Sequence, residues 1–269
     1  MRRKVPVGLL AAPLAWLLVA YLGALAAIFA TAFFTTDSFT GAVVRDFSLD
    51  NYREVLTPTY LSIIVRTVLI ASLVTVLCIL IAVPYAWFMA RVVPSRWRGA
   101  AVALVLVPLW ASYLVKAYAW RAMVQPKGVL DSVFGATPGY GLAAVVLTLT
   151  YLWLPYMVLP VYAGLDRLPA SHLEASADLG AGAWTTFRRV VLPAVKPSIA
   201  AGTIFTFSLS LGDYIAVSIV GGKLQVLGTA VLQNNTLDLP FAAALGTVSV
   251  FIMVAYLLAV RRTGALDNL

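Results

Sequence analysis

Long apolar stretches alternate with shorter polar connections along this sequence. An α-helix needs about 20 apolar residues to cross the hydrocarbon core of a bilayer, and six stretches reach or approach that length. They predict membrane-spanning helices at about residues 7–34, 64–90, 100–122, 141–164, 197–221 and 239–260. We therefore expect an all-α polytopic membrane protein, in which residues 1–269 form one domain with six transmembrane helices.

Composition supports this assignment. The chain is 62% hydrophobic and only 11% charged, whereas soluble domains carry roughly 25% charged residues. The first apolar stretch, residues 5–36, is much longer than the apolar core of a secretory signal, which has about 7–15 residues. We therefore expect it to stay attached as the first span. In the connection that follows, residues 50–56 are expected to form a short helix.

The positions of the basic residues indicate how the chain is inserted. If the N-terminus is cytoplasmic and the spans alternate, 12 of the 19 Lys and Arg residues fall on the cytoplasmic side. Cytoplasmic loops are enriched in these residues, so we expect both termini and the connection 165–196 in the cytoplasm. The basic residues are scattered at the ends of apolar stretches, so the net charge of +8 does not indicate nucleic-acid binding.

The connection 165–196 is the most polar long connection in the chain. Ser171 and Glu174 have the spacing of a capping box, which predicts a helix that starts near His172. Gly180 can end this helix, because glycine accepts the left-handed conformation of a C-cap. A second short helix is expected over about 183–191, ending before Pro193. The pattern predicts a helix–turn–helix outside the membrane, and an ordinary amphipathic loop is the simpler alternative.

The chain lacks the residue clusters of common catalytic and metal sites. It has one cysteine, Cys78, which is expected to pack in the interior, and one histidine, His172, which is expected to face solvent. Gly221-Gly222-Lys223 lacks the spacing of a phosphate-binding loop. We therefore predict no catalytic residue, no metal site and no cofactor bound by this chain.

Asp213 is the one acidic residue inside a predicted span. A charge at this depth is costly unless it faces a cavity or a partner, so Asp213 is a candidate functional-site residue. A structural ion pair with Lys116 or Arg121 is an equal alternative. Three aromatic residues could offer their ring faces to a cation, although packing explains them as well: Tyr214, Trp110 and Tyr113.

The connection 165–196 resembles the EAA loop of ABC-importer permeases. The resemblance rests on Glu174-Ala175-Ser176, then Gly180, then Phe187 and Leu192-Pro193. In that family the loop is cytoplasmic and docks into a groove on the ATP-hydrolysing subunit. The resemblance implies a type I ABC-importer permease fold with a cytoplasmic coupling helix. It assigns the contact with the ATPase to five residues: Glu174, Ala175, Leu179, Gly180 and Phe187.

Other stretches look like spermidine/putrescine permeases of the same family. They are residues 47–52, 110–120, 154–162 and 210–214, so the resemblance covers most of the chain from about 47 to 260. It implies a polyamine as the transported solute and a bacterial inner membrane as the location. With this resemblance, the translocation path is assigned to four residues: Asp213, Tyr214, Trp110 and Tyr113. Permeases for iron, thiamine and phosphonates are similar in the same stretches, so another small solute is the alternative.

The resemblance also implies a set of partners. They are a dimer of ATPase subunits that holds ATP and Mg²⁺, a second permease that forms a heterodimer with this chain, and an extracytoplasmic substrate-binding protein. Two other classes of membrane protein are the alternatives. A stand-alone secondary transporter is expected to show internal repeats or more buried ionisable residues, and a membrane enzyme is expected to show a catalytic cluster.

Overall fold

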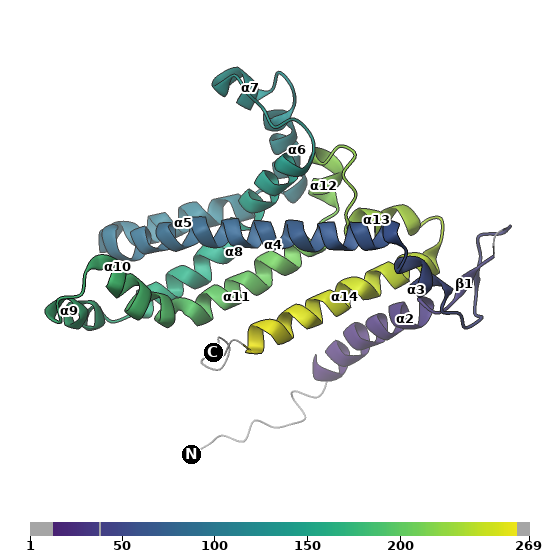
Figure 1. Cartoon of the computed structure of the whole chain (residues 1–269), viewed down its shortest axis with the longest axis horizontal. Helices are drawn as coiled ribbons and strands as arrows, with labels where there is room; N and C mark the ends of the chain where they lie inside the picture. Colours follow the sequence, from purple (N-terminus) through teal and green to yellow (C-terminus); the bar gives the residue numbers. More distant parts are fainter. Residues whose placement is uncertain (1–12, 38, 263–269) are drawn as a thin grey trace, which may run out of the picture. The chain divides into compact units, whose positions relative to one another are not determined.

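The computed structural model describes residues 13–37 and 39–262, and most of these residues are helical (Figure 1). Five of the helices in these ranges are long and apolar enough to cross a membrane: Pro13–Thr31, Pro58–Val92, Leu142–Arg167, Ala183–Leu211 and Leu239–Arg262. A sixth span is available if the bent pair Ser95–Trp110 and Tyr113–Val124 counts as one. The predicted all-α polytopic fold is confirmed. Residues 7–12 of the predicted first span lie outside the described ranges.

The chain divides into two compact units. The first comprises Met1–Ser62 and Ala230–Phe251, and the second comprises Ile63–Thr229 and Ile252–Leu269. The division cuts through three helices: α4 (Pro58–Trp87), α13 (Leu227–Asn234) and α14 (Leu239–Arg262). The sequence predicted a single domain. Hydropathy records the length of each apolar stretch but not which stretches pack together, so it could not reveal this division.

The first unit contains η1 (Leu18–Leu22), α2 (Gly23–Thr31), the short strands β1 (Thr35–Thr36) and β2 (Val43–Val44), and α3 (Asp50–Val55). The strands form an antiparallel hairpin in which Thr35 pairs with Val44. Asp37 accepts hydrogen bonds from the amides of Thr40 and Phe39 in the hairpin loop, and these bonds hold the pKa of its carboxyl below the usual value. The predicted short helix at 50–56 is confirmed as α3.

Polar contacts connect the pieces of the first unit. The Asn51 side chain donates to the carbonyls of Ala32 and Phe34, at 2.9 Å each, and so holds α3 against the end of α2. The Tyr52 hydroxyl lies 3.1 Å from the Thr247 hydroxyl of α14. These bonds satisfy backbone and hydroxyl groups that would be costly to leave unpaired in an apolar environment.

The core of the second unit is formed mainly by α4, α8 (Leu142–Arg167) and the helices packed on them. Cys78 is buried in this core, as predicted for a packing cysteine. α8 and α11 (Leu192–Leu211) approach closely at Gly202, where an added Cβ would lie 2.5 Å from Met157 Sδ. Glycine at this position therefore allows the two helices to pack side by side (Figure 1).

The predicted third span, 100–122, is not one straight helix. α5 (Ser95–Trp110) and α6 (Tyr113–Val124) meet at a bend of 91°. Ala111 and Ser112 between them are extended, with ψ of 140° and 136°. Hydropathy does not distinguish a bent apolar stretch from a straight one. Pro108 lies inside α5 and already removes one backbone hydrogen bond just before the bend. After α6 the chain forms α7 (Val129–Phe134).

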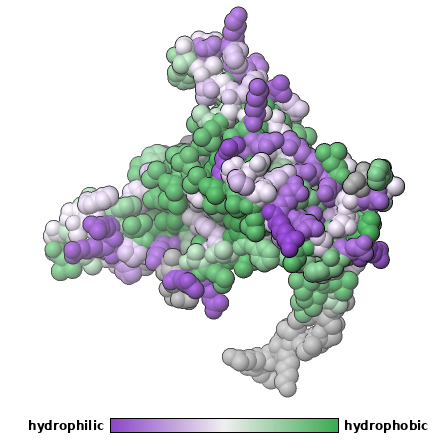
Figure 2. Space-filling view, turned by 45° about the vertical axis from the view of Figure 1, so that its right-hand side comes forward, coloured by the Kyte–Doolittle hydropathy of each residue, from purple (hydrophilic) through white to green (hydrophobic). Residues whose placement is uncertain are grey.

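The predicted fifth span, 197–221, is shifted. The helix that contains Pro197 starts at Ala183 and ends at Leu211. Residues 212–214 then interrupt it before the short helix α12 (Ile215–Val220). Pro197, where the span was expected to begin, is therefore an interior residue of this helix. Figure 2 shows hydrophobic residues over the middle of the visible surface and hydrophilic residues towards α9 (Ala170–Asp178) and α10 (Ala183–Thr186).

Candidate functional site

The first candidate site is the segment 165–196, which we call the loop segment. It comprises α9, a turn, α10 and the π-helical turn η3 (Phe187–Val191), which leads directly into α11. The helix–turn–helix predicted from the sequence is present. The segment lies at one end of α8 and α11 (Figure 1).

Gly180 forms the turn that ends α9. Its φ is +75°, a left-handed conformation. The Gly180 amide donates to the Ala177 carbonyl at 2.8 Å, and the Ala181 amide donates to the Ser176 carbonyl at 3.1 Å. This pair of bonds is the Schellman arrangement, which satisfies the last carbonyls of a helix. The prediction that Gly180 ends the helix as a left-handed C-cap is confirmed.

The predicted capping box is wrong. Pro169 is the N-cap of α9, and within the described residues no side chain forms a capping hydrogen bond there. Ser171 and Glu174 are already inside the helix. The residue before a proline avoids the α conformation, so Leu168 is extended and the chain breaks there. The helix then starts directly after Pro169, two residues earlier than the Ser-x-x-Glu pattern indicated.

The second helix of the loop segment does not end before Pro193. It continues without interruption from Ala183 to Leu211. A proline in a helix lacks the N–H group and crowds the carbonyl four residues earlier. Here η3 precedes Pro193, and the wider π-helical spacing accommodates this change of hydrogen bonding. The second helix of the loop segment and the following span are therefore one continuous helix, Ala183–Leu211.

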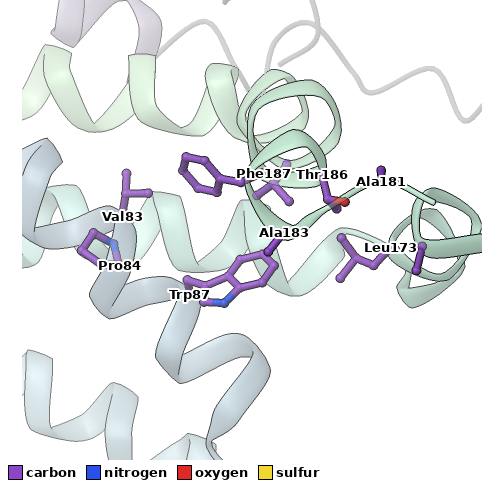
Figure 3. Close-up of a pocket in the computed structure, with 10 residues that line it drawn as sticks. Val83, Pro84, Trp87, Leu173, Ala181, Ala183, Thr186 and Phe187 are labelled. Atoms are coloured by element: carbon purple, nitrogen blue, oxygen red, sulfur yellow. The ribbon is translucent and has the colours of Figure 1, made fainter. Parts of the chain in front are cut away.

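One side of the loop segment packs against the rest of the second unit. Leu173 and Phe187 lie against the main hydrophobic core. The hydroxyls of Ser176 and Thr186 are 2.9 Å apart and connect α9 to α10. Between the loop segment and α4 there is an apolar pocket of about 590 Å³. Figure 3 shows the Phe187 ring opposite Val83 and the Trp87 indole near Ala183.

The other side of the loop segment is exposed. Glu174, Ala175 and Gly180 are exposed, and Leu179 is 88% exposed. A second pocket of about 650 Å³ lies on this side and is lined by Ala175, Leu179, Gly180 and neighbouring residues. Of the five residues predicted to contact an ATPase, Ala175, Leu179 and Gly180 line this pocket, and Glu174 is exposed but does not line it. Phe187 does not line it either, because its ring faces the interior.

Trp184 was missed by the sequence reasoning. It is 72% exposed and stacks on Phe187, with ring centroids 5.7 Å apart. Exposed tryptophan is uncommon in solvent and is enriched where proteins meet other proteins. The sequence feature that could have indicated Trp184 is an aromatic residue in the middle of the most polar connection.

The second candidate site lies where two interrupted helices meet. Tyr113 begins α6, directly after the bend at Ala111–Ser112, and Asp213 lies between α11 and α12. The Tyr113 hydroxyl donates a hydrogen bond to Asp213. The Ala216 amide donates to the same carboxylate at 2.9 Å. Asp213 is only 7% exposed, so these donors stabilise a carboxylate that has little water around it.

A cavity of about 290 Å³ adjoins this pair. Tyr113, Trp153, Asp213 and Tyr214 all line it. The Trp153 indole lies 5.9 Å from the Tyr113 ring, centroid to centroid. Its Nε1–H is buried and has no hydrogen-bond partner among the described residues. The cavity thus presents an acidic group and aromatic side chains to any small solute that enters.

The structure tests two predictions at this site. Asp213 forms no ion pair with Lys116 or Arg121 in the described part of the chain. Its side-chain partner is Tyr113 instead, and Arg121 lies over the Tyr140 ring. Trp110 does not line the cavity and is 88% exposed, because the bend that follows it separates it from Tyr113. The tryptophan that lines the cavity is Trp153, which was not predicted from the sequence.

The family of the chain follows from its sequence. The chain belongs to the family of binding-protein-dependent transport system inner membrane components, whose model matches residues 4–262. It is a permease of an ABC importer and a multi-pass protein of the bacterial inner membrane. Permeases of this kind carry a solute across the membrane and are not themselves enzymes.

Particular relatives narrow this assignment. The chain is 40% identical to the inner membrane ABC transporter permease protein YdcU of Escherichia coli (strain K12), over 97% of this chain and 90% of that protein. It is 31% identical to the spermidine/putrescine transport system permease protein PotB of the same organism, over 90% of this chain and 91% of that protein.

Solved structures share the fold. One is a bacterial ABC transporter that imports the acidic polysaccharide alginate, with a TM-score of 0.71 and 17% identity over 95% of this chain and 94% of that one. Another is the MetNI methionine ABC transporter in an inward-facing conformation, with a TM-score of 0.62 and 18% identity over 77% of this chain and 97% of that one. At these identities the likeness concerns the fold alone.

Proposed function

We propose that this chain forms the translocation path for a polyamine, such as spermidine or putrescine, in an ATP-driven importer. The observation that carries this choice of solute is the 31% identity to PotB, which extends over 90% of the chain. In the proposed complex a second permease completes the path, and an extracytoplasmic binding protein delivers the solute. A dimer of ATPase subunits binds ATP and Mg²⁺, and this chain binds no cofactor.

The loop segment is the proposed contact with the ATPase, on the cytoplasmic side of the membrane. Its exposed face combines an apolar anchor, Leu179, with the small residues Ala175 and Gly180 around a pocket. An exposed apolar side chain beside a concave surface is the kind of feature that binding partners use as an anchor. The Schellman turn at Gly180 supports this role because it fixes the position of Leu179 relative to α9.

ATP acts on such a permease by changing the balance between two conformations. The ATPase dimer closes when it binds ATP, and the docked loop segments move together and favour the outward-open state. Hydrolysis and release of the products reverse this bias. Each ligand shifts the equilibrium only by the difference between its affinities for the two states. The loop segment must therefore be held firmly by the rest of the permease.

Substitution of Leu179 tests the contact with the ATPase. Leu179→Glu places a charge in the proposed apolar contact, and we expect it to reduce co-purification of the ATPase by about tenfold or more. Leu237→Glu is a matched control, because Leu237 is also exposed (73%) but lies in the first unit. Both variants are expressed with the complete transporter and purified in mild detergent. Equal retention of the ATPase by both variants would contradict the proposed docking surface.

The cavity beside Asp213 is the proposed place where the solute passes. A polyamine carries protonated amines, which a carboxylate and aromatic faces stabilise. Asp213 supplies the charge, while Tyr113, Trp153 and Tyr214 supply ring faces. In the present conformation Tyr113 occupies one acceptor position on Asp213. An ammonium group that reaches Asp213 therefore competes with the Tyr113 hydroxyl.

Uptake of labelled spermidine tests this part of the proposal. Asp213→Asn keeps the shape of the side chain but removes its charge. We expect uptake per assembled complex to fall by about tenfold, because an amide does not replace a charge-assisted hydrogen bond. Equal losses of uptake and assembly would indicate a structural role for Asp213. A wild-type complex that hydrolyses ATP but transports neither spermidine nor putrescine would overturn the choice of solute.

A further inference from the structure

Two corners of the second unit have the same construction. At the first corner α4 continues into η2 (Phe88–Val92) and ends at Val93, before Pro94. At the second corner α8 ends at Leu168, before Pro169, and α9 follows. Both residues before proline are extended, with ψ of 125° and 118°, as expected from the crowding that proline imposes. The second corner sets the direction in which α9 leaves α8.

Arg91 connects the two corners. Its Nη2 donates hydrogen bonds to the carbonyls of Leu165, at 2.9 Å, and Leu168, at 2.6 Å. The last carbonyls of a helix lack partners within the helix and carry partial negative charge. A guanidinium placed there satisfies two acceptors with charge-assisted bonds. Leu165 and Leu168 are both buried, so water would replace these bonds poorly.

The position of the Arg91 side chain is further defined by its own helix. Its guanidinium carbon lies 6.0 Å from the centre of the Trp87 ring, one turn earlier. Its Nε is buried and has no hydrogen-bond partner among the described residues. In the conformation that bonds to the carbonyls of Leu165 and Leu168, the Arg91 side chain therefore leaves its Nε–H without a hydrogen bond to any described residue.

A second arginine makes a weaker link between the same corners. Arg98 Nε donates to the Val93 carbonyl at 3.2 Å, and Arg98 Nη1 lies 3.5 Å from Asp166 Oδ1. The side chains of this ion pair are 35% and 48% exposed. Solvent screens a pair of this kind, and such pairs contribute little. Arg98 is therefore a suitable internal comparison for Arg91.

The apolar contact between α4 and the loop segment is incomplete. Val83, Pro84 and Trp87 of α4 face Leu173 and Phe187 across the pocket of about 590 Å³ (Figure 3). Close packing transmits displacement because protein interiors contain few voids. A pocket of this size therefore weakens the transmission of movement between the loop segment and α4 through apolar contacts. The bonds from Arg91 cross to the loop segment beside this pocket.

We propose that Arg91 is a positioning residue that couples the movement of α9 to α4. This inference rests on the proposed docking of the loop segment onto an ATPase. When docking displaces α9, the corner at 165–168 moves with it, and Arg91 carries the displacement to the end of α4. Because α4 and η2 form one helix of 35 residues, Pro58–Val92, the displacement reaches most of the depth of the membrane.

The test compares three variants in the complete transporter, reconstituted into vesicles with its ATPase and binding protein. Arg91→Met keeps most of the apolar length and removes all donors. Arg91→Lys keeps a charge with three donors, and Arg98→Met removes the weaker link. We expect Arg91→Met to lower solute uptake per ATP hydrolysed by about tenfold while the ATPase stays bound. Arg91→Lys should recover a large part of this ratio, and Arg98→Met should change it by less than about twofold.

A distance measurement provides a second readout. Spin labels at Phe88, the first residue of η2, and Asp178, on α9, are both placed at exposed positions. In the wild type their separation should change as one narrow distribution when ATP is added, and in Arg91→Met it should broaden. An unchanged distribution together with a wild-type ratio of uptake to hydrolysis would overturn the proposal. A loss of uptake that only follows the loss of assembled complex would do the same.

Failure of this proposal can be separated from failure of the proposed function. A wild-type chain that binds no ATPase contradicts the docking of the loop segment. An Arg91→Met variant that binds the ATPase and keeps the wild-type ratio contradicts the role of Arg91 alone.

Discussion

The loop segment and the Asp213 site are both built where helices are interrupted, but the interruptions differ. In the loop segment they occur at Pro169 and Gly180, two residues that restrict or permit particular backbone conformations. At the Asp213 site they occur at Ala111–Ser112, three residues after Pro108, and at residues 212–214. There a buried hydrogen bond between Tyr113 and Asp213 links the two interruptions. Local backbone preference thus defines the first site, whereas a tertiary contact links the parts of the second.

This difference has a practical consequence. A site defined by backbone preference should respond mainly to substitutions that change the allowed φ and ψ angles. A site held by one buried polar pair should respond mainly to loss of either partner. Substitutions in the loop segment and at Tyr113 test this distinction.

Gly180→Val should have the largest effect on the loop segment. Valine at φ +75° is strained by about 1–2 kcal/mol or more, because its branched Cβ crowds the backbone in the left-handed region. We expect α9 to lose its Schellman turn and ATP hydrolysis to become uncoupled from uptake. The measurement is solute uptake per ATP hydrolysed in reconstituted vesicles.

Gly182→Val is the matched control for Gly180→Val. Gly182 has φ −67° and ψ 161°, which valine accepts readily, and an added Cβ meets nothing within 4 Å. We expect uptake close to that of the wild type. If the two valine variants lose uptake equally, the effect comes from bulk in the turn and not from backbone conformation.

Tyr113→Phe should have an intermediate effect at the Asp213 site. The substitution removes the hydroxyl donor but keeps the ring and leaves the Asp213 charge in place. If the charge serves a cationic solute, uptake should stay within about threefold of the wild type, because the ammonium group no longer competes with the hydroxyl. Labelled spermidine uptake per complex measures this. A loss equal to that of Asp213→Asn would show that the hydrogen bond itself is what matters.

Replacement of Ser176 and Thr186 by alanine should have the smallest effect on uptake. Their hydroxyls form one neutral hydrogen bond between α9 and α10, and such bonds contribute about 0.5–1.5 kcal/mol. We expect Ser176→Ala and Thr186→Ala each to lower uptake slightly, and the double variant to be no worse than the more affected single variant. Additive losses in this double-mutant cycle would mean that the two residues act separately.

The sequence predicted most of the loop segment because its signals are local. Gly180 was expected at the end of a helix and lies there with positive φ. The start of that helix was placed too late, because Pro169 dominates over the Ser-x-x-Glu pattern. The expected stop before Pro193 was also wrong, since a π-helical turn accommodates the proline inside a continuous helix. Both errors concern the residue at which a helix starts or stops next to a proline.

The Asp213 site was less predictable because it depends on contacts between distant residues. The sequence indicated Asp213 as a candidate because it is an acid in an apolar stretch. The structural alternative was an ion pair with Lys116 or Arg121. The observed partner, Tyr113, is 100 residues away in the chain. It reaches Asp213 only because α6 turns by 91° relative to α5. Hydropathy does not record that bend, so it could not indicate that Trp153, and not Trp110, lines the cavity beside Asp213.

The continuous helix Ala183–Leu211 gives the molecule a lever between its two sites. It has 29 residues, and at about 1.5 Å per residue it is roughly 43 Å long. One end carries the exposed Trp184, and the other end stops directly before Gly212 and Asp213. A tilt of about 5° around one end of a rod of this length displaces the other end by roughly 4 Å. That distance exceeds the length of a hydrogen bond, so a small rotation at the loop segment is geometrically sufficient to separate Asp213 from Tyr113.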